Sequence, residues 1–286
     1  MQQEHIKIAI GDAHFDNKAP LALIGGINVL ESYELAMEAA TVYVATVKEL
    51  GMPFVFKASF DKANRSSINS FRGPGLKEGL RILSDIKDKF SVPVITDVHE
   101  PSQAAAAAEV CDALQLPAFL ARQTDLVTAL AQTNKPINIK KPQFISHREI
   151  TSIIDKFAAA GNKKLLLCER GNSFGYNNLV VDMLGFGILK STGYPVVFDV
   201  THSLQIPGGQ TIAEGGTAAG GRGESVFELA RAGVSQGIAA LFLEAHPDPK
   251  IAKCDGPCAL ALADLPKFLK QMCELDTLIK GLESRD

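Results

Sequence analysis

The chain alternates short apolar runs with longer segments of mixed polarity. Each run is a few residues long, rich in Val, Ile, Leu and Phe, and apolar nearly throughout. Such runs are typical of parallel strands that are covered on both faces, because neither face then needs polar residues. The runs occupy residues 21–26, 53–59, 92–98, 112–117, 136–141, 163–170, 194–202 and 239–246.

The segments between these runs carry helix signals. Residues 31–50 open with acidic side chains, residues 100–110 are rich in alanine, and residues 148–161 close at a glycine. Alternating strands and helices over residues 21–286 predict an α/β fold of the (β/α)8 or TIM-barrel type. A doubly wound open sheet is the alternative, but it usually has fewer units and a nucleotide-binding fingerprint, which we do not find.

The first part of the chain differs from the rest. Residues 5–15, HIKIAIGDAHF, alternate in polarity around a Gly-Asp turn and predict a β-hairpin. We expect this hairpin, within residues 1–20, to cap the bottom of a barrel formed by residues 21–286. Because no linker, charge block or internal repeat interrupts the sequence, we expect one domain over residues 1–286.

Composition narrows the class of function. Hydrophobic residues make up 46% and charged residues 21% of the chain, and the formal net charge is -3. This balance argues against a nucleic-acid partner, which needs a basic face, so local basic clusters suggest small anions. No apolar run is long enough to cross a membrane and no secretion signal is evident, so we predict a cytoplasmic protein. Five scattered cysteines suit reduced thiols.

The carboxyl ends of the strands are the place to look for chemistry, because TIM-barrel enzymes build their active sites there. That rule turns the linear sequence into a ring of polar and charged residues. The ring contains Asn28, Lys57, Ser59, Lys62, Asp97, His99, Gln115, Lys140, Lys141, Arg170, Asp199, His202, Glu244, His246 and Asp255.

The cations of this ring come from strands that are not neighbours. Lys57, Lys62, Lys140 and Arg170 would repel one another at one barrel mouth unless an anion joined them. A phosphate or carboxylate removes that repulsion through charge-assisted hydrogen bonds. The pattern therefore favours phosphorylated small-molecule substrates over ordinary solvated loops.

The ring residues do not decide whether the protein binds a divalent metal ion. His202, Glu244 and Asp255 follow the last two predicted strands and match three ligands of a divalent Fe, Mn or Zn site. Equally, His202 could be a hydrogen-bonded imidazole and the acids could balance the cations. The CDGPC segment, residues 254–258, favours free thiols, because its spacing is not that of a thiolate metal site.

A glycine-rich segment, residues 207–224, matches no nucleotide-binding motif. We interpret it as a mobile loop that follows the seventh strand, and a lid is one role for it.

Several motifs together resemble the 3-deoxy-D-manno-octulosonate 8-phosphate synthases, also called 2-dehydro-3-deoxyphosphooctonate aldolases. They include GGINVLES, FKASFDKANRSS, TDVHEP, QLPAFLARQTDL, KKPQF, CERG, FGYNNLVVDM, DVTHSLQ, EAHPDP and CDGP, and the match runs from about residue 20 to 275. The sister heptulosonate synthases typically carry KPRTS where this chain has KANRSS.

The resemblance implies condensation of phosphoenolpyruvate with D-arabinose 5-phosphate on the way to lipopolysaccharide. It places phosphoenolpyruvate among Lys57, Ser59, Lys62, Gln115, Ala118, Lys140, Gln143 and Arg170. It places the sugar phosphate among Asn64, Arg65, Ser66, Asp97, Arg122 and His202. It places catalysis on Lys62, His202, Asp255, Asn28 and Glu244, with Lys62 handling a proton near the aldehyde and His202 and Asp255 near the attacking water.

The resemblance also bears on metals and assembly. The metal-dependent branch of the family has a cysteine where this chain has Asn28, so the chain is similar to the branch that needs no metal or other cofactor. It implies a homotetramer in which Phe119 and Arg122 reach a neighbouring subunit's site. Arg222 receives no substrate contact, because its segment matches the family less closely.

Three other functions stay open at this point. The main rival is a 3-deoxy-D-arabino-heptulosonate 7-phosphate synthase that uses erythrose 4-phosphate. A Schiff-base aldolase is a second, since Lys140 ends a strand. A catalytically silent phosphosugar-binding barrel is the third.

Overall fold

The computed structural model describes residues 5–211 and 217–282. Its centre is a closed ring of parallel strands, which confirms the predicted TIM barrel. The eight strands of the ring are β3 (Ala22–Val29), β4 (Phe54–Ser59), β5 (Val94–Asp97), β6 (Ala113–Leu116), β7 (Ile137–Lys140), β8 (Leu165–Glu169), β11 (Val196–Asp199) and β14 (Ala240–His246).

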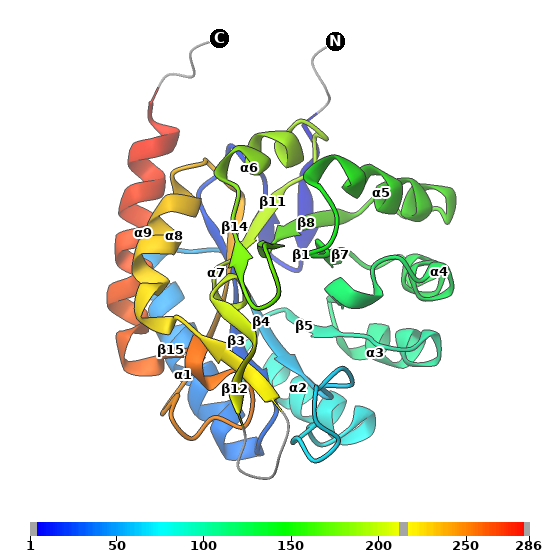
Figure 1. The fold of residues 1–286 in the computed structure, drawn as a ribbon, viewed down its shortest axis with the longest axis vertical. Helices are drawn as coiled ribbons and strands as arrows, with labels where there is room; N and C mark the ends of the chain where they lie inside the picture. Colours follow the sequence, from blue (N-terminus) through cyan, green and yellow to red (C-terminus); the bar gives the residue numbers. More distant parts are fainter. Residues whose placement is uncertain (1–4, 212–216, 283–286) are drawn as a thin grey trace.

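Helices surround the ring (Figure 1). They are α1 (Tyr33–Leu50), α2 (Leu76–Phe90), α3 (Ala104–Val110), α4 (Thr124–Gln132), α5 (Ile150–Ala159), α6 (Met183–Lys190), α8 (Val226–Val234) and α9 (Leu265–Lys280), with a one-turn helix α7 (Val200–Ser203) after β11. Local signals set their ends: the Ser32 hydroxyl caps α1 by accepting a hydrogen bond from the Leu35 amide, and Gly51 ends α1 in a left-handed conformation. No helix in the described part of the chain is long and apolar enough to cross a bilayer.

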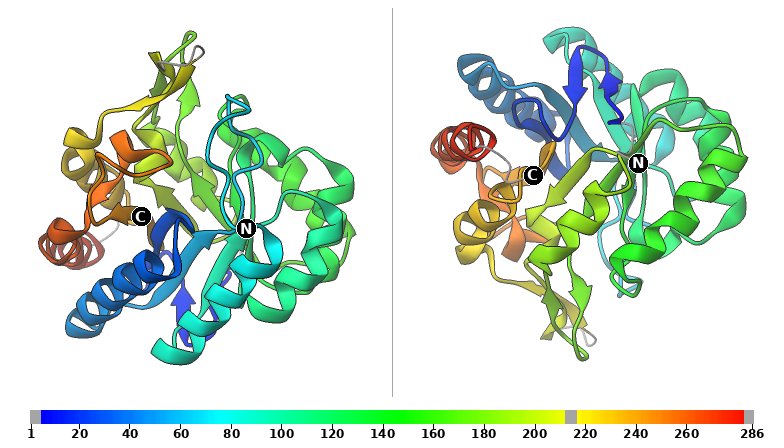
Figure 2. Two further views of the ribbon diagram at one scale, coloured as in Figure 1. Left: turned by 90° about the horizontal axis from the view of Figure 1, so that it is seen from below. Right: turned by 90° about the horizontal axis from the view of Figure 1, so that it is seen from above.

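Short strands complete the fold outside the ring. They are β1 (Ile8–Ile10) with β2 (Ala13–Phe15), β9 (Asn172–Ser173) with β10 (Leu179–Val180), β12 (Gln205–Thr211) with β13 (Thr217–Gly221), and β15 (Leu260–Ala261), which pairs in parallel with the end of β14. The β1–β2 hairpin confirms the prediction for residues 5–15 and lies opposite the end that carries β12–β13 (Figure 2). Its apolar residues Ile8, Ile10 and Phe15 pack into the barrel interior, so it fills the bottom of the barrel.

Two apolar layers hold the fold together. Inside the barrel, Val55, Leu166 and Phe242 belong to one cluster together with the hairpin residues, and outside it the strands pack against the helices in a second cluster. Each strand therefore buries both faces, which is why the sequence shows continuous apolar runs.

The glycine-rich segment 207–224 forms an antiparallel hairpin in its described part, instead of the loop that the sequence suggested. Strand pairing runs from Gln205 with Gly221 to Thr211 with Thr217, and residues 212–216 lie outside the described residues. Arg222 ties the base of this hairpin to the β9–β10 region by donating to the Asn178 side chain and the Leu179 carbonyl, at 3.2 and 3.0 Å. A lid role for the hairpin stays a prediction.

Candidate active site

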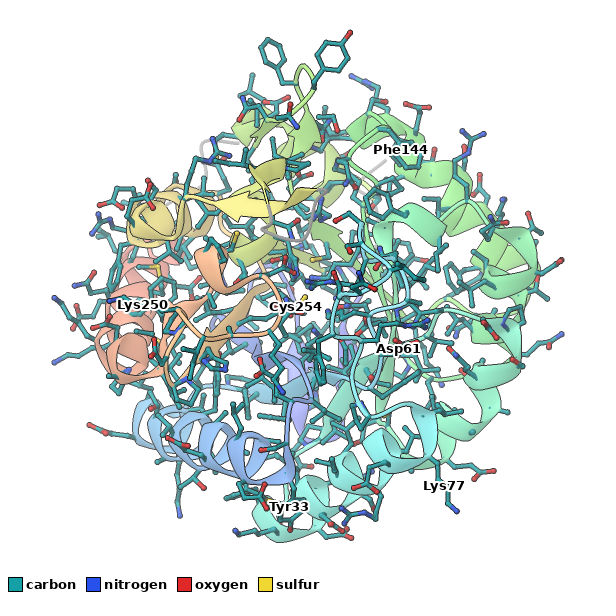
Figure 3. The ribbon with its side chains drawn as sticks, turned by 60° about the horizontal axis from the view of Figure 1, so that its bottom comes forward. Tyr33, Asp61, Lys77, Phe144, Lys250 and Cys254 are labelled. Atoms are coloured by element: carbon teal, nitrogen blue, oxygen red, sulfur yellow. The ribbon has the colours of Figure 1, made fainter. Side chains whose placement is uncertain are left out.

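A cavity of about 410 Å³ lies at the carboxyl ends of the barrel strands. In Figure 3, Cys254 lies near the middle of this end, between Lys250 and Asp61. The predicted site residues that line the cavity are Lys57, Lys62, Asn64, Arg65, Ser66, Asp97, Gln115, Ala118, Lys140, Gln143, Arg170, His202 and Asp255. Asn28, Ser59 and Glu244 lie just beneath it, each bonded to a lining residue.

Asn28 sits at the centre of the predicted metal-ligand set. Its amide nitrogen donates to Glu244 Oε2 at 2.6 Å and to Asp255 Oδ2 at 2.9 Å, and it lies 3.5 Å from His202 Nε2. Asn28 lies within a register shift between Gly26 and Val29 of β3. Gly26 is required at this point because a Cβ there would lie 2.0 Å from the Lys57 carbonyl oxygen. The three predicted ligands therefore converge on an amide N–H₂ group.

Lys57 forms a buried ion pair with Glu244. Its ammonium donates to Glu244 Oε1 at 2.6 Å and to the Asn28 carbonyl at 3.0 Å, and both charged side chains are 1% exposed. Burial acts to raise the pKa of Glu244, but the nearby Lys57 ammonium, together with the His202 ring, outweighs burial and lowers it. Lys57 thus lies at the cavity floor as the counter-ion of Glu244.

Asp199 connects the other buried lysine to the histidine. Its Oδ2 lies 2.5 Å from Lys140 Nζ and 2.7 Å from His202 Nδ1, and its Oδ1 accepts the His202 backbone N–H at 2.9 Å. The Lys140 ammonium also stands 3.0 Å from the centre of the Phe242 ring. Asp199 is fully buried, and its contacts with the His202 ring and the Lys140 ammonium hold its pKa well below its usual range against the effect of burial.

Lys62 belongs to a third charged group. Its ammonium lies 4.0 Å from Asp97 Oδ2, and Asp97 in turn accepts from the Ser59 hydroxyl at 2.5 Å and lies 3.4 Å from His99 Nε2. Burial acts to lower the pKa of Lys62, but Asp97, Glu244 and Asp255 outweigh it and hold that pKa above the usual value. Lys62 is therefore a stable cation that can donate a charge-assisted hydrogen bond.

Gln115 and Arg170 line the cavity wall from β6 to β8, and Asn138 lies buried behind Gln115. Asn138 donates to Gln115 Oε1 at 2.9 Å, which turns the Gln115 amino group away from Asn138. Arg170 donates through Nη2 to Gln205 at 2.8 Å, while its buried Nη1 has no partner among the described residues. Buried donors normally have a partner, so the free face of Arg170 fits an anionic ligand.

Of the residues predicted for the sugar phosphate, Asn64, Arg65 and Ser66 form the rim, whereas Asp97 and His202 lie deeper in the cavity. Asn64, Arg65 and Ser66 follow β4, and Arg65 reaches across the mouth to Cys254 Sγ and the Lys253 carbonyl. Phe119 lines the cavity and is 54% exposed. Arg122 is exposed and does not line the cavity of this chain.

The chain is similar to known proteins over nearly its whole length. Residues 3–281 match the model of the family described as DAHP synthetase I. The chain belongs to the DAHP synthetase I family. Proteins named 2-dehydro-3-deoxyphosphooctonate aldolase from Pseudomonas fluorescens strain Pf0-1 and from Ectopseudomonas mendocina are each 62% identical to it, over 96% and 98% of both chains. The protein of that name from Hahella chejuensis is 61% identical over 98% of both chains.

Membership of the DAHP synthetase I family agrees with the resemblance drawn from the motifs. Sequence reasoning placed Asp199 and His99 at strand ends but gave them no role, and it did not single out Asn138 or Gln205. The signal for Asn138 was a polar residue inside an apolar strand, which costs free energy unless it is hydrogen-bonded. Gln205 could not have been found in this way, because its partner Arg170 lies 35 positions earlier, before β9, β10, α6 and β11.

Proposed function

We infer that this protein condenses phosphoenolpyruvate with D-arabinose 5-phosphate and water to give 3-deoxy-D-manno-octulosonate 8-phosphate and inorganic phosphate. The convergence of cations from β4, β7 and β8 on one cavity carries this conclusion, in a chain 62% identical to proteins named 2-dehydro-3-deoxyphosphooctonate aldolase. The enzyme is a transferase, and its product serves lipopolysaccharide synthesis in the cytoplasm.

Phosphoenolpyruvate would lie against the wall formed by Gln115, Lys140, Gln143 and Arg170. The unpaired Nη1 of Arg170 and the outward amino group of Gln115 are donors that a phosphate or carboxylate can accept from. Ala118 borders the same part of the cavity. These fixed donors hold the substrate in one orientation, so little reorganisation is needed when charge develops.

The sugar phosphate would lie at the rim, on Asn64, Arg65 and Ser66. This places the aldehyde deeper in the cavity, toward Lys62 and Asp97. When C3 of phosphoenolpyruvate bonds to the aldehyde carbon, the aldehyde oxygen gains negative charge. Lys62 remains a cation because its pKa is held above its usual value, so it would stabilise that oxygen by a charge-assisted hydrogen bond. As the alkoxide is more basic than an amine, the proton could then pass from Lys62 to the oxygen.

Water would add to C2 on the side of His202 and Asp255, and the C–O bond to phosphate would then break. Asp199 fixes the His202 ring through Nδ1, which points Nε2 at Asn28 and Asp255. A ring held in this way can orient a water molecule and accept its proton.

We also propose that the reaction needs no metal. In the described residues, the carboxylates of Glu244 and Asp255 each accept a hydrogen bond from the Asn28 amide, which is a donor and cannot ligate through that nitrogen. The amide therefore lies between the carboxylates where a cation would otherwise lie, and the Lys57 ammonium balances the charge of Glu244.

The test is phosphate release from phosphoenolpyruvate with each aldose, with and without a chelator. We expect release with arabinose 5-phosphate that a chelator leaves unchanged. Faster release with erythrose 4-phosphate would favour the heptulosonate synthase instead. Loss of activity on chelation, restored by a divalent ion, would overturn the metal proposal alone.

We propose a homotetramer as well, in which the exposed Phe119 and Arg122 complete a neighbouring site. Sedimentation should then give four chains. An Arg122→Ala variant that assembles normally but keeps the wild-type KM for arabinose 5-phosphate would contradict the shared site.

A further inference from the structure

Behind the phosphoenolpyruvate wall lies a second group of charged residues that do not line the cavity. At the carboxyl ends of β7 and β8, Lys140 and Arg170 face the cavity, whereas their neighbours Lys141 and Glu169 are fully buried outside its lining. Successive side chains of a strand point to opposite faces, so the pair lies between the barrel and its helices. His147, which is 5% exposed, joins them.

Glu169 is the centre of this group. Its Oε2 lies 2.8 Å from His147 Nε2 and 3.6 Å from Lys141 Nζ, and its Oε1 accepts the Gly171 backbone N–H at 2.6 Å. Gly171 has a φ of +85°, a conformation that favours glycine. Glu169 therefore fixes the turn that begins at Arg170.

Lys141 ties this turn to the preceding loop. Its ammonium donates to the Asn172 side-chain oxygen at 2.5 Å, and Asn172 donates to the Ile145 carbonyl at 3.3 Å. In addition, the Ser173 amide donates to the Gln143 carbonyl at 2.9 Å. The loops that carry Gln143 and Arg170 are thus joined by one buried network.

The outer side of the network is closed by helix α6. A Cβ at Gly185 of α6 would lie 2.2 Å from His147 Nε2, so the ring has no room to move outward. Buried charges of this kind are costly unless they are paired, and an apolar set of similar volume could fill the same space. A role beyond packing is therefore worth testing.

We propose that Glu169, with Lys141 and His147, forms a positioning unit that holds Arg170 and Gln143 in the orientation required for the phosphoenolpyruvate anion. The proposal rests on the function inferred above. It assigns these three residues no contact with substrate. Their effect on binding is exerted through the backbone of the two loops.

Two variants perturb the unit from different sides. Glu169→Gln keeps the size of the side chain and an acceptor for the Gly171 N–H, but it removes the charge that faces Lys141 and His147. Gly185→Ala leaves all three residues intact and pushes His147 off its place. The matched control is Asp276→Asn, because Asp276 is another buried acid, bonded to the Leu21 amide and Lys280 at the other end of the barrel.

The readouts are phosphoenolpyruvate affinity by calorimetry, the KM of each substrate, and the melting temperature. We expect both test variants to weaken phosphoenolpyruvate binding and raise its KM by about tenfold or more, while the KM of arabinose 5-phosphate changes less than about twofold. Asp276→Asn should lower the melting temperature without changing either KM.

Wild-type phosphoenolpyruvate affinity in both variants would overturn the proposal, as would an equal rise in both KM values. If Glu169→Gln does not fold, Gly185→Ala alone decides. Absence of phosphoenolpyruvate binding by the wild-type protein would instead refute the proposed function, so the two failures can be told apart.

Discussion

Replacing Asn28 by aspartate tests the reasoning about the centre of the site. The two side chains have the same shape, so the new oxygen would take the place of an amide nitrogen that lies 2.6 Å from Glu244 and 2.9 Å from Asp255. At an effective dielectric constant near 20, each such contact between unit charges repels by roughly 6 kcal/mol. Holding a proton at pH 7 on a carboxyl of ordinary pKa costs only about 4 kcal/mol. The variant cluster will therefore take up a proton.

The direction of the pH effect follows from that proton. The folded variant binds one more proton than its unfolded chain, so its stability relative to the wild type falls as pH rises from about 4 to the raised pKa of the cluster. The slope is about 1.4 kcal/mol per pH unit, which gives roughly 3 kcal/mol between pH 5 and pH 7. A divalent cation should replace the proton and raise the melting temperature of the variant at pH 7.

The assay is denaturant unfolding of the wild type and Asn28→Asp at pH 5, 6 and 7. Asn69→Asp is the matched control, because it adds the same charge at an exposed position and should show no such slope. A stability difference between wild type and Asn28→Asp that is the same at pH 5 and pH 7 would refute the assignment of Asn28 as the donor between two carboxylates.

Three further predictions concern the other buried contacts. Lys57→Met should lower the free energy of unfolding by about 3–5 kcal/mol, because it leaves Glu244 buried without its cation. Adding Glu244→Gln should restore part of that loss, and denaturant titrations measure both changes. The stability difference between Asp199→Asn and the wild type should be greatest at neutral pH and should shrink below pH 4. The reason is that the folded protein lowers the pKa of Asp199, which adds stability only at pH values where Asp199 is ionised in the unfolded chain. A difference independent of pH in thermal melts would contradict this. Asn138→Leu should raise the KM of phosphoenolpyruvate about tenfold and leave the KM of arabinose 5-phosphate unchanged, because it frees the Gln115 amide to turn. Steady-state kinetics that show the reverse would exclude a role for Asn138 in orienting Gln115.

Much of the fold could be predicted from local pattern. The eight apolar runs became the eight barrel strands, and residues 5–15 became the hairpin in the barrel floor. These elements could be predicted because a strand buried on both faces needs apolar side chains throughout, and that pattern is visible within a few consecutive residues. The hairpin in residues 207–224 was missed, since its glycines signal a turn and its register is set by pairing between distant positions.

The residue types around the barrel mouth were also present in the order of the chain, since each follows the end of a strand. Their partners were not. Lys57 is bonded to Glu244, 187 positions away, and Lys140 to Asp199, 59 positions away. Those contacts exist because β14 pairs with both β3 and β11 to close the ring, which brings opposite charges into a dry interior where each must find a partner. Local pattern thus set which groups surround the cavity, and closure of the barrel set which of them remain free to bind a substrate.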